Sequence, residues 1–169
     1  MDIQLESNHF KWVENLALEE INIEESGIIS MESSRDQQAQ MEESSIELMD
    51  DLRELFEIYV SKFNQLRASA EQDQHKTIKM FKISNSVNDF MLFRNSLKLA
   101  FTRKEIDTIA IGFLSHRTAT QGEQVDNFHL LKADLGPFNE VQWKFQGENI
   151  NKLSLVKHFL TEFIRTSSQ

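Results

Sequence analysis

The chain has 169 residues, of which 40% are hydrophobic and 27% charged, so it is long enough for one domain with a substantial core and too apolar to be disordered throughout. The absence of cysteine excludes a disulfide framework, a thiol nucleophile and thiolate metal ligands. The sequence has no apolar run of about 18 residues and no recognisable secretory signal, so we expect a soluble, cytoplasmic protein.

Charge is distributed unevenly along the chain, whose net charge is −9. Residues 1–75 carry 18 acidic and 5 basic side chains, whereas residues 76–117 carry 3 acidic and 8 basic ones. Residues 118–169 are nearly neutral, with 6 acidic and 5 basic side chains. This polarity indicates either an acidic arm that folds back on a mildly basic body or two surfaces for different partners.

Residues 1–44 show no sustained hydrophobic period and are rich in Glu, Ser and Gln after a short apolar patch. Low hydrophobicity combined with high like charge cannot offset the entropy lost when a chain is ordered. We therefore predict an acidic, largely flexible N-terminal arm with a short helix at residues 9–20. The arm is either a solvated tail or a segment that docks on a partner through Phe10, Trp12 and Leu16.

Residues 45–169 have the pattern of a single α+β globular domain, which begins with an amphipathic helix. Ser44 or Ser45 is suited to the N-cap, and acidic residues follow in the first turns, where the helix dipole favours negative charge. The helix of about 25 residues is predicted to end within residues 69–72. Its apolar residues recur at steps of three or four: Leu48, Leu52, Leu55, Tyr59, Phe63 and Leu66. Three further apolar residues widen this stripe: Met49, Phe56 and Val60.

Residues 76–94 are predicted to contain a strand and a short helix. The strand covers residues 76–83, and its three lysines are typical of an edge strand that is protected against pairing with other chains. The helix covers residues 86–93, where apolar side chains fall at helical spacing after a serine. An extended connection is the alternative for this second segment.

Residues 95–117 have the pattern of a β-hairpin whose arms alternate apolar with polar or small side chains. If Phe101 lies opposite Ile109, a three-residue loop at 104–106 joins the arms and their apolar sides coincide. Two further pairs follow from the same register: Leu99 with Ile111, and Leu97 with Phe113. The residues at the centre of the opposite face of this hairpin have small side chains.

A second hairpin is predicted after a polar loop. Its strands cover residues 128–133 and 141–146, and a turn containing Gly, Pro and Asn joins them at residues 135–139. The last strand alternates strictly between apolar and polar residues, so we expect the sheet to have one wet face. A C-terminal helix follows, capped by Asn149 or Asn151.

The predicted order of elements is arm, long helix, strand, short helix, two hairpins and helix. Antiparallel strands clustered between helices are typical of the α+β class. We expect a meander-like antiparallel sheet of about five strands, with the long N-terminal helix and the C-terminal helix covering one of its faces. The regular alternation of strands and helices that a doubly wound sheet requires is missing.

The sequence has no recognisable catalytic, phosphate-binding or metal-binding motif, and we predict neither a cofactor nor a metal site. No two of the five histidines have metal-ligand spacing. His158 and Glu162 lie one helical turn apart, which is typical of an exposed side-chain contact. His116 and His129 flank the loop between the hairpins and form a candidate acid–base pair, although a polar sheet edge explains them equally well.

Basic residues gather along the first hairpin and define a candidate binding surface: Lys98, Arg103, Lys104, His116 and Arg117. Sheets that bind single-stranded nucleic acids stack bases on aromatic side chains. In this hairpin Phe101 and Phe113 share a face with leucine and isoleucine, which is the composition of a core. The alternative interpretation is therefore a buried phenylalanine core with basic loop ends.

The sequence favours a non-catalytic protein–protein interaction or assembly protein: an adaptor, a regulator or a chaperone-like protein that forms a homodimer or binds a protein partner. This hypothesis depends on the uneven charge, on the missing catalytic constellation and on three surplus apolar residues, Phe10, Trp12 and Phe138. The alternatives are single-stranded nucleic-acid binding by the basic end of the first hairpin, and an enzyme that uses His116 and His129. No membrane partner is expected.

Overall fold

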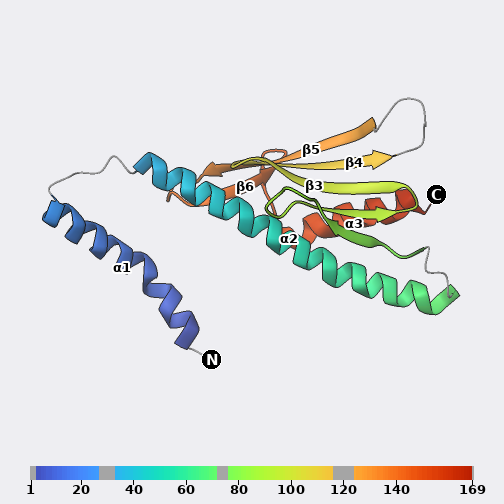
Figure 1. The fold of residues 1–169 in the computed structure, drawn as a ribbon, viewed down its shortest axis with the longest axis horizontal. Helices are drawn as coiled ribbons and strands as arrows, with labels where there is room; N and C mark the ends of the chain where they lie inside the picture. The colour runs from blue at the N-terminus through green and yellow to red at the C-terminus, as the bar shows by residue number, and fades with distance from the viewer. Residues whose placement is uncertain (1–2, 27–32, 72–75, 116–123, 169) are drawn as a thin grey trace. The chain divides into compact units, whose positions relative to one another are not determined.

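The computed structural model describes the following parts of the chain (Figure 1): residues 3–26, 33–71, 76–115 and 124–168. The chain divides into two compact units, residues 1–37 and residues 38–169, and each is described by itself. His116 and Arg117, two residues of the predicted basic surface, lie outside the described residues.

The first unit contains helix α1, Ile3–Ser26, which is longer than the helix predicted at residues 9–20. Its sequence contains neither glycine nor proline, and Gly27 follows its last residue. Glutamate and leucine have good helix propensity, so the segment is helical in spite of its weak hydrophobic period. Whether residues 1–44 act as a flexible arm stays a prediction.

Helix α2, Ser33–Glu71, continues into the second unit, so the prediction that it starts at Ser44 or Ser45 is wrong. Ser45 is fully buried within the helix, where its hydroxyl group donates a hydrogen bond to the carbonyl oxygen of Glu42 at 2.7 Å. The segment before Ser45 is rich in Gln and Glu, two residues with good helix propensity. They lengthen the helix but do not contribute to a periodic apolar pattern.

The buried side of α2 is narrower than the predicted stripe. Tyr59 and Leu66, which the pattern placed in that stripe, are 43% and 61% exposed. The buried residues all belong to the predicted stripe and recur mainly at steps of four, which keeps them on one side of the helix. They are Leu48, Met49, Leu52, Phe56 and Val60.

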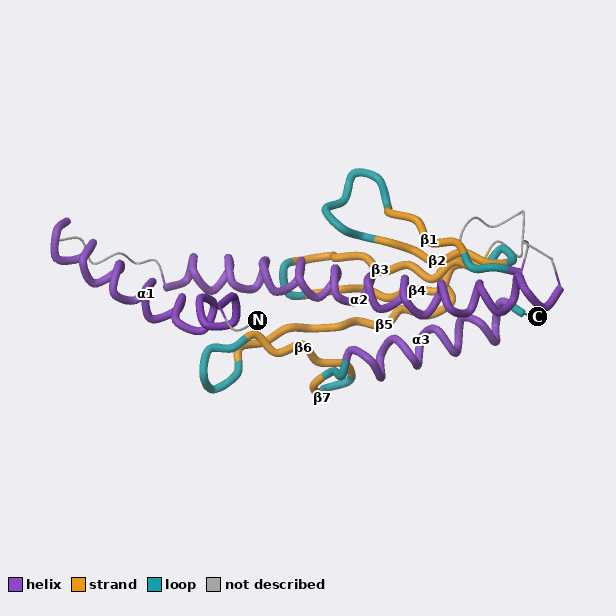
Figure 2. Tube along the Cα trace, turned by 90° about the horizontal axis from the view of Figure 1, so that it is seen from below, coloured by secondary structure: helices purple, strands orange, loops and turns teal. Residues whose placement is uncertain are grey.

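Seven strands form one antiparallel sheet in the order of the sequence (Figure 2). Each strand pairs with the next, so the sheet is a meander, and helix α3, Lys152–Ser167, packs against it. The fold class is α+β, as predicted, with seven strands where about five were expected. The strands are β1 Lys79–Lys82, β2 Phe90–Arg94, β3 Leu97–Glu105, β4 Thr108–Ser115, β5 Gln124–Leu135, β6 Val141–Phe145 and β7 Glu148–Asn149.

The prediction of a short helix at residues 86–93 is wrong, because β2 occupies the end of that segment. Phe90 and Leu92 are buried whereas Met91 and Phe93 are half-buried, which is the period-two pattern of a strand. A run of consecutive apolar residues fits helical and extended periods equally well, so the sequence alone does not decide between them. Strand β7 has only two residues, too few to produce a pattern.

The hairpin of β3 and β4 has a different register from the predicted one. Phe101 pairs with Ile111 instead of Ile109, a shift of two residues. The ladder is irregular between Arg103 and Glu105, and β3 continues through most of the predicted loop. A shift of two residues keeps every side chain on its face, so the apolar sides still coincide.

The second hairpin and the C-terminal helix are confirmed. Strands β5 and β6 pair from Leu131 opposite Phe145 to Leu135 opposite Val141. Asn151 is the N-cap of α3, and its side-chain oxygen accepts a hydrogen bond from the backbone N–H of the third residue of the helix at 3.1 Å.

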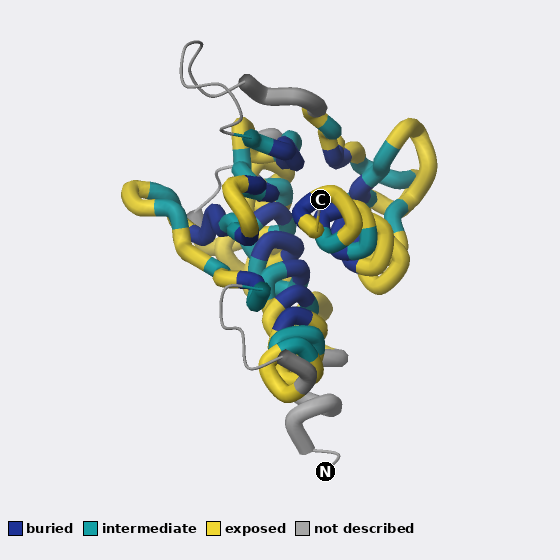
Figure 3. The backbone as a smooth tube through the Cα atoms, turned by 90° about the vertical axis from the view of Figure 1, so that its right-hand side faces the viewer, coloured by how far each residue is buried: buried dark blue, intermediate teal, exposed yellow. Residues whose placement is uncertain are grey.

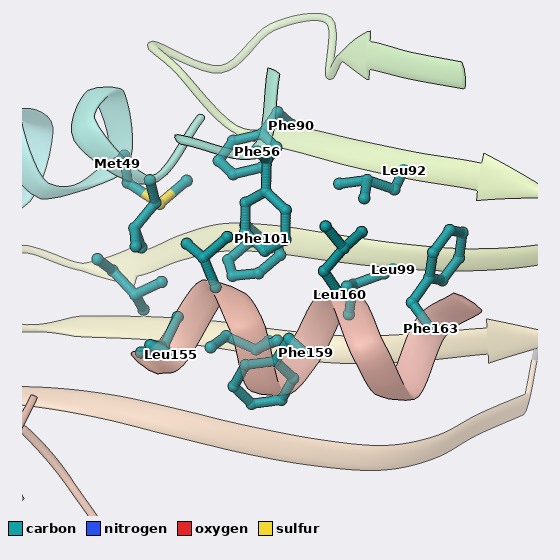
Figure 4. Packing of buried hydrophobic residues seen from close by; sticks show 14 of the residues in the cluster. Met49, Phe56, Phe90, Leu92, Leu99, Phe101, Leu155, Phe159, Leu160 and Phe163 are labelled. Carbon is teal, nitrogen blue, oxygen red and sulfur yellow. The ribbon is translucent and has the colours of Figure 1, made fainter. Parts of the chain in front are cut away.

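Helices α2 and α3 lie on the same face of the sheet, and the core fills the space between them and the strands. In Figure 3 buried stretches alternate with exposed ones along the helix that ends at the C-terminus, as expected for a helix with one side against the core. Phe101 of β3 is central to this core (Figure 4): its ring centroid is 4.8 Å from that of Phe90, 5.0 Å from Phe56 on α2 and 6.3 Å from Phe159 on α3. Burial of such a side chain stabilises the fold by roughly 1.5–3 kcal/mol.

Candidate interaction surface

The sheet has an open face, which we define as the face opposite to α2 and α3. Side chains alternate along each strand, so β3 directs Leu99 and Phe101 to the helices and Ala100 to the open face. The strand register extends this face across five strands. One cross-strand row contains Phe81, Met91, Ala100, Gly112 and Phe128.

Large apolar side chains are exposed on the open face. Phe81 is 45% exposed, Phe128 58% and Leu130 43%, although each belongs to a strand within the sheet. Single exposed apolar residues are normal on protein surfaces, but a group of them on one sheet face is a feature of interaction sites. Between β2 and β5 the open face has a central strip of small residues: Ala100, Thr102, Ala110 and Gly112.

Lysines accompany these apolar side chains on the open face. The register places four of them there: Lys79, Lys98, Lys132 and Lys144. A carboxylate of the same face, Asp134, forms an ion pair with the Nζ of Lys144 at 3.0 Å. The open face is therefore both apolar and basic, a combination that suits a partner with apolar and acidic side chains.

The predicted basic surface does not form one patch in the part of the chain that the structure describes. Lys98 lies on the open face, whereas Arg103 points to the other face, where its Nη1 donates to the hydroxyl of Ser45 at 3.1 Å and lies 3.8 Å from a carboxylate oxygen of Glu42. Lys104 is exposed at the irregular end of β3. Arg103 therefore joins α2 to the sheet.

The predicted partner-binding residues are all exposed. On α1, Phe10 is 57% exposed, Trp12 66% and Leu16 53%. Phe138 is 83% exposed in the turn between β5 and β6. Sequence reasoning therefore found apolar residues that lie on the surface, although their binding role stays a prediction.

The histidines do not form a recognisable catalytic centre among the described residues. The ring of His129 lies 5.7 Å from that of Phe145 and 5.5 Å from that of Phe159, so it belongs to an aromatic cluster beside the core. His158 contacts Glu162 at 3.6 Å on the exposed side of α3, as predicted. The described residues also contain no group of three His, Asp or Glu side chains with the geometry of a metal site. A pair formed by His116 and His129 stays a prediction.

A hollow of about 420 Å³ is lined by residues of α2 and α3. Its walls are mainly apolar, with Tyr59, Leu160 and Ile164 among the lining residues, and Lys157 is its charged member. The lining includes no histidine and no carboxylate, so it offers no acid–base pair of the usual kind.

Arg94 is a buried cation that the sequence did not single out. Its guanidinium donates hydrogen bonds to the carbonyl oxygens of Lys76 at 2.9 Å and Ile164 at 3.3 Å, and it lies 5.2 Å from the centre of the Phe63 ring. Burial lowers the pKa of this group below its ordinary value, and the positive charge of Arg67 lowers it further. A cation is favourable at a helix C-terminus, so Arg94 fixes the end of α3 on the sheet.

Sequence reasoning missed the apolar side chains of the open face. The signal was present, because consecutive apolar residues such as Leu130 and Leu131 give a strand two apolar faces. The same holds for the run from Phe90 to Phe93. A strand with one wet face would have shown strict alternation, as β6 does.

Comparison of the chain with family models, with curated proteins and with solved structures found no match. Among the described helices, none is long and apolar enough to cross a membrane. Function is therefore inferred from the chemistry of the surface.

Proposed function

We propose that this protein is a non-catalytic protein–protein interaction or assembly protein whose α+β body binds a protein partner through the open face. The observation that carries the proposal is the exposure of Phe81, Phe128 and Leu130 on one sheet face. Burial of apolar area is the main favourable term in protein association, at roughly 25 cal/mol per Å². A face of this composition gains free energy when a partner covers it.

The second candidate function is single-stranded nucleic-acid binding by the same face. Exposed Phe81 and Phe128 beside lysines resemble the aromatic platforms on which bases stack. The aliphatic residues Met91, Leu114 and Leu130 share that face, however, and side chains of this kind favour a protein surface over a base.

The test compares two full-length variants that each place a carboxylate at an exposed apolar position. One is Phe128→Glu with Leu130→Glu on the open face, and the other is Ile58→Glu on α2, where Ile58 is 64% exposed. The tagged proteins are purified from the cells that make the protein, and bound proteins are identified by mass spectrometry. We expect the wild type and Ile58→Glu to retain the same partner, which is either another protein or a second copy, and the open-face variant to lose it.

Retention of the same partner by all three proteins would overturn the proposal that the open face is the binding surface. Nucleic-acid binding is measured separately by fluorescence anisotropy of labelled single-stranded and duplex oligonucleotides at low salt. If the wild type binds an oligonucleotide and the open-face variant does not, we would conclude that the open face binds a nucleic acid and not a protein. Its affinity should then depend on salt, which is characteristic of phosphate contacts.

A further inference from the structure

We propose that the outer edge of β1 binds an extended acidic segment of a protein partner, which adds a strand to the sheet. Strand β1 is the first in the strand order, and its outer edge is the one that faces away from β2 (Figure 2). Addition of a strand to a sheet edge is a recurrent way of binding peptides, in which main-chain hydrogen bonds give affinity. The inference goes beyond the proposed function, because it concerns this edge and not the open face.

The ladder between β1 and β2 determines which backbone groups of β1 point outward. The backbone N–H of Ile83 donates to the carbonyl oxygen of Asp89 at 2.9 Å, in the register that the ladder continues. Hydrogen-bonded and non-hydrogen-bonded pairs alternate along an antiparallel ladder, so Phe81 bonds to β2 whereas Met80 and Lys82 do not. The backbone groups of Met80 and Lys82 therefore point to the outer edge.

A side chain of α2 already completes the same edge two residues before Met80. The backbone N–H of Ile78 donates to Oδ1 of Asn64 at 2.7 Å, and the carbonyl oxygen of Ile78 accepts from Nδ2 at 2.8 Å. The amide of Asn64 thus takes the place of a peptide group of a neighbouring strand. Among the described residues, no hydrogen bond reaches the outward backbone groups of Met80 and Lys82. Each of these two residues therefore offers one donor and one acceptor to an added strand.

The side chains of β1 define the chemistry of the segment that fits. Lys79 and Phe81 point to the open face, and Met80 and Lys82 point to the face that carries the helices. Both lysines are exposed, and Phe81 is 45% exposed. A strand beside β1 therefore meets a lysine, two apolar side chains and a second lysine in that order. Opposite charges and apolar pairs stabilise facing strands, so the matching pattern is acidic, apolar, apolar, acidic.

Two other occupants suit this edge less well. Strand β1 of a second copy brings lysines and no carboxylate, and lysines on an edge strand normally prevent such pairing. The acidic residues of α1 and α2 belong to helices, whose backbone groups bond within the helix and cannot add a strand. An acidic segment in an extended conformation has both the required charges and free backbone groups.

The experiment uses the full-length protein and the synthetic peptide acetyl-Thr-Glu-Val-Val-Glu-Thr-amide, in which Thr and Val favour an extended chain. Binding is followed in proton–nitrogen NMR spectra with about 0.05–5 mM peptide. A control peptide with the central order Val-Glu-Glu-Val should bind about fivefold more weakly, since it places carboxylates opposite Met80 and Phe81. A second control peptide, with Lys in place of both Glu, should bind at least about tenfold more weakly.

The backbone amides of β1 give a readout that charge attraction alone would not change. At saturating peptide, exchange of the Met80 and Lys82 amide protons with water should slow at least about threefold, because both become bonded to the peptide. The amide of Phe81, which is already bonded to β2, should keep its exchange rate. Unchanged exchange at Met80 and Lys82 would overturn the inference.

Three full-length variants locate the site, and circular dichroism checks that each is folded. Lys79→Glu with Lys82→Glu should weaken peptide binding at least about tenfold. Lys157→Glu with Arg165→Glu makes the same charge change at exposed positions of α3 and should alter binding less than about twofold. Met80→Pro removes one outward donor and leaves the ladder with β2 intact, so it should weaken binding at least about threefold. If Met80→Pro does not fold, the exchange of the wild-type amides still decides.

A wild type that binds none of the peptides up to about 5 mM overturns the inference, and so does undiminished binding by the charge-reversed β1 variant. Self-association in sedimentation equilibrium that Met80→Pro abolishes would show that a second copy occupies the edge instead. Phe128→Glu with Leu130→Glu should retain the peptide, and its loss would place the site on the open face. This inference and the proposed function can therefore fail separately, because the purification test alters only the open face.

Discussion

The two faces of the sheet differ in size and burial although the same strands make both. On β3 and β4 the side chains directed to the helices, such as Phe101 and Ile109, are large and fully buried. Those directed to the open face, such as Ala100 and Gly112, are small. The covered face holds the core together, whereas the open face leaves apolar and basic groups accessible. The side chains that stabilise the fold and those of the proposed binding surface therefore lie on opposite sides of one layer.

The largest expected effect separates two adjacent leucines of β5 that point to opposite faces. Leu131 is fully buried against the helices, and Leu130 is 43% exposed on the open face. Leu131→Ala should lower the free energy of unfolding by roughly 2–5 kcal/mol, since it removes buried area and leaves a cavity. Leu130→Ala should lower it by less than about 1 kcal/mol. Urea denaturation of both variants measures the difference, and equal losses would contradict the distinction between the faces.

The second prediction concerns the cation that attaches α3 to the covered face. Arg94→Met removes the donor to the carbonyl oxygens of Lys76 and Ile164, and it should cost about 1–3 kcal/mol of unfolding free energy. Hydrogen exchange should also become faster in the last turn of α3. Arg165→Met is the control, because Arg165 is exposed in that turn and its loss should cost less than about 0.5 kcal/mol.

The pH dependence of Arg94 follows from the sign of its pKa shift. Burial lowers the pKa in the folded protein, so the folded state binds the proton less tightly than the unfolded state does. Stability from this group would then rise with pH only in the strongly alkaline range, between the folded and unfolded pKa values. At neutral pH both states keep the proton. Between roughly pH 6 and 9, Arg94→Met should therefore lower stability by the same amount at each pH.

A smaller effect is expected at the start of α3. Asn151→Ala removes the side-chain oxygen that accepts the backbone N–H of Ser154, and it should cost about 1 kcal/mol, with a range of roughly 0.5–2. Asn149→Ala is the control, since Asn149 is exposed in β7 and is not the cap. If thermal and urea unfolding gave the two variants the same stability, the covered face would not depend on this cap.

The smallest effect is expected on the outer side of α3, which faces solvent. Glu162→Gln removes the carboxylate that lies 3.6 Å from His158, and both side chains are largely exposed. Exposed pairs one helical turn apart contribute roughly 0.3–0.5 kcal/mol, so unfolding measurements should detect little change. A loss above about 1 kcal/mol would mean that the outer side of α3 contributes more than a solvated helix surface does.

Periodicity predicted those parts of the fold in which one side of an element is buried and the other is wet. Strand β6 alternates strictly and was located correctly, and Asn151 was one of the two residues suggested as the cap of α3. Before Ser45 in α2, helix propensity extends the helix without a recurring apolar period, so periodicity could not locate its start and the predicted start was wrong. Where apolar residues are consecutive, as in β2, the same sequence fits two periods.

For the candidate surface, the sequence identified Phe10, Trp12, Leu16 and Phe138 as apolar residues without a place in the core, and all four are exposed. It could not identify the open face, because membership of that face depends on how five strands align. The alignment requires the register of every pair, and the register of β3 and β4 differs from the predicted one by two residues.

The sequence by itself determined the α+β class, the lack of cysteine, the acidic N-terminal part, and the parity with which β3, β4 and β6 divide their side chains between two faces. Local side-chain chemistry and period suffice for these properties. Tertiary structure alone decided that both helices cover the same face and that Phe81, Phe128 and lysines such as Lys98 and Lys132 share the other. Such a surface is assembled from strands distant in sequence, and only the packing of the helices determines which face stays open.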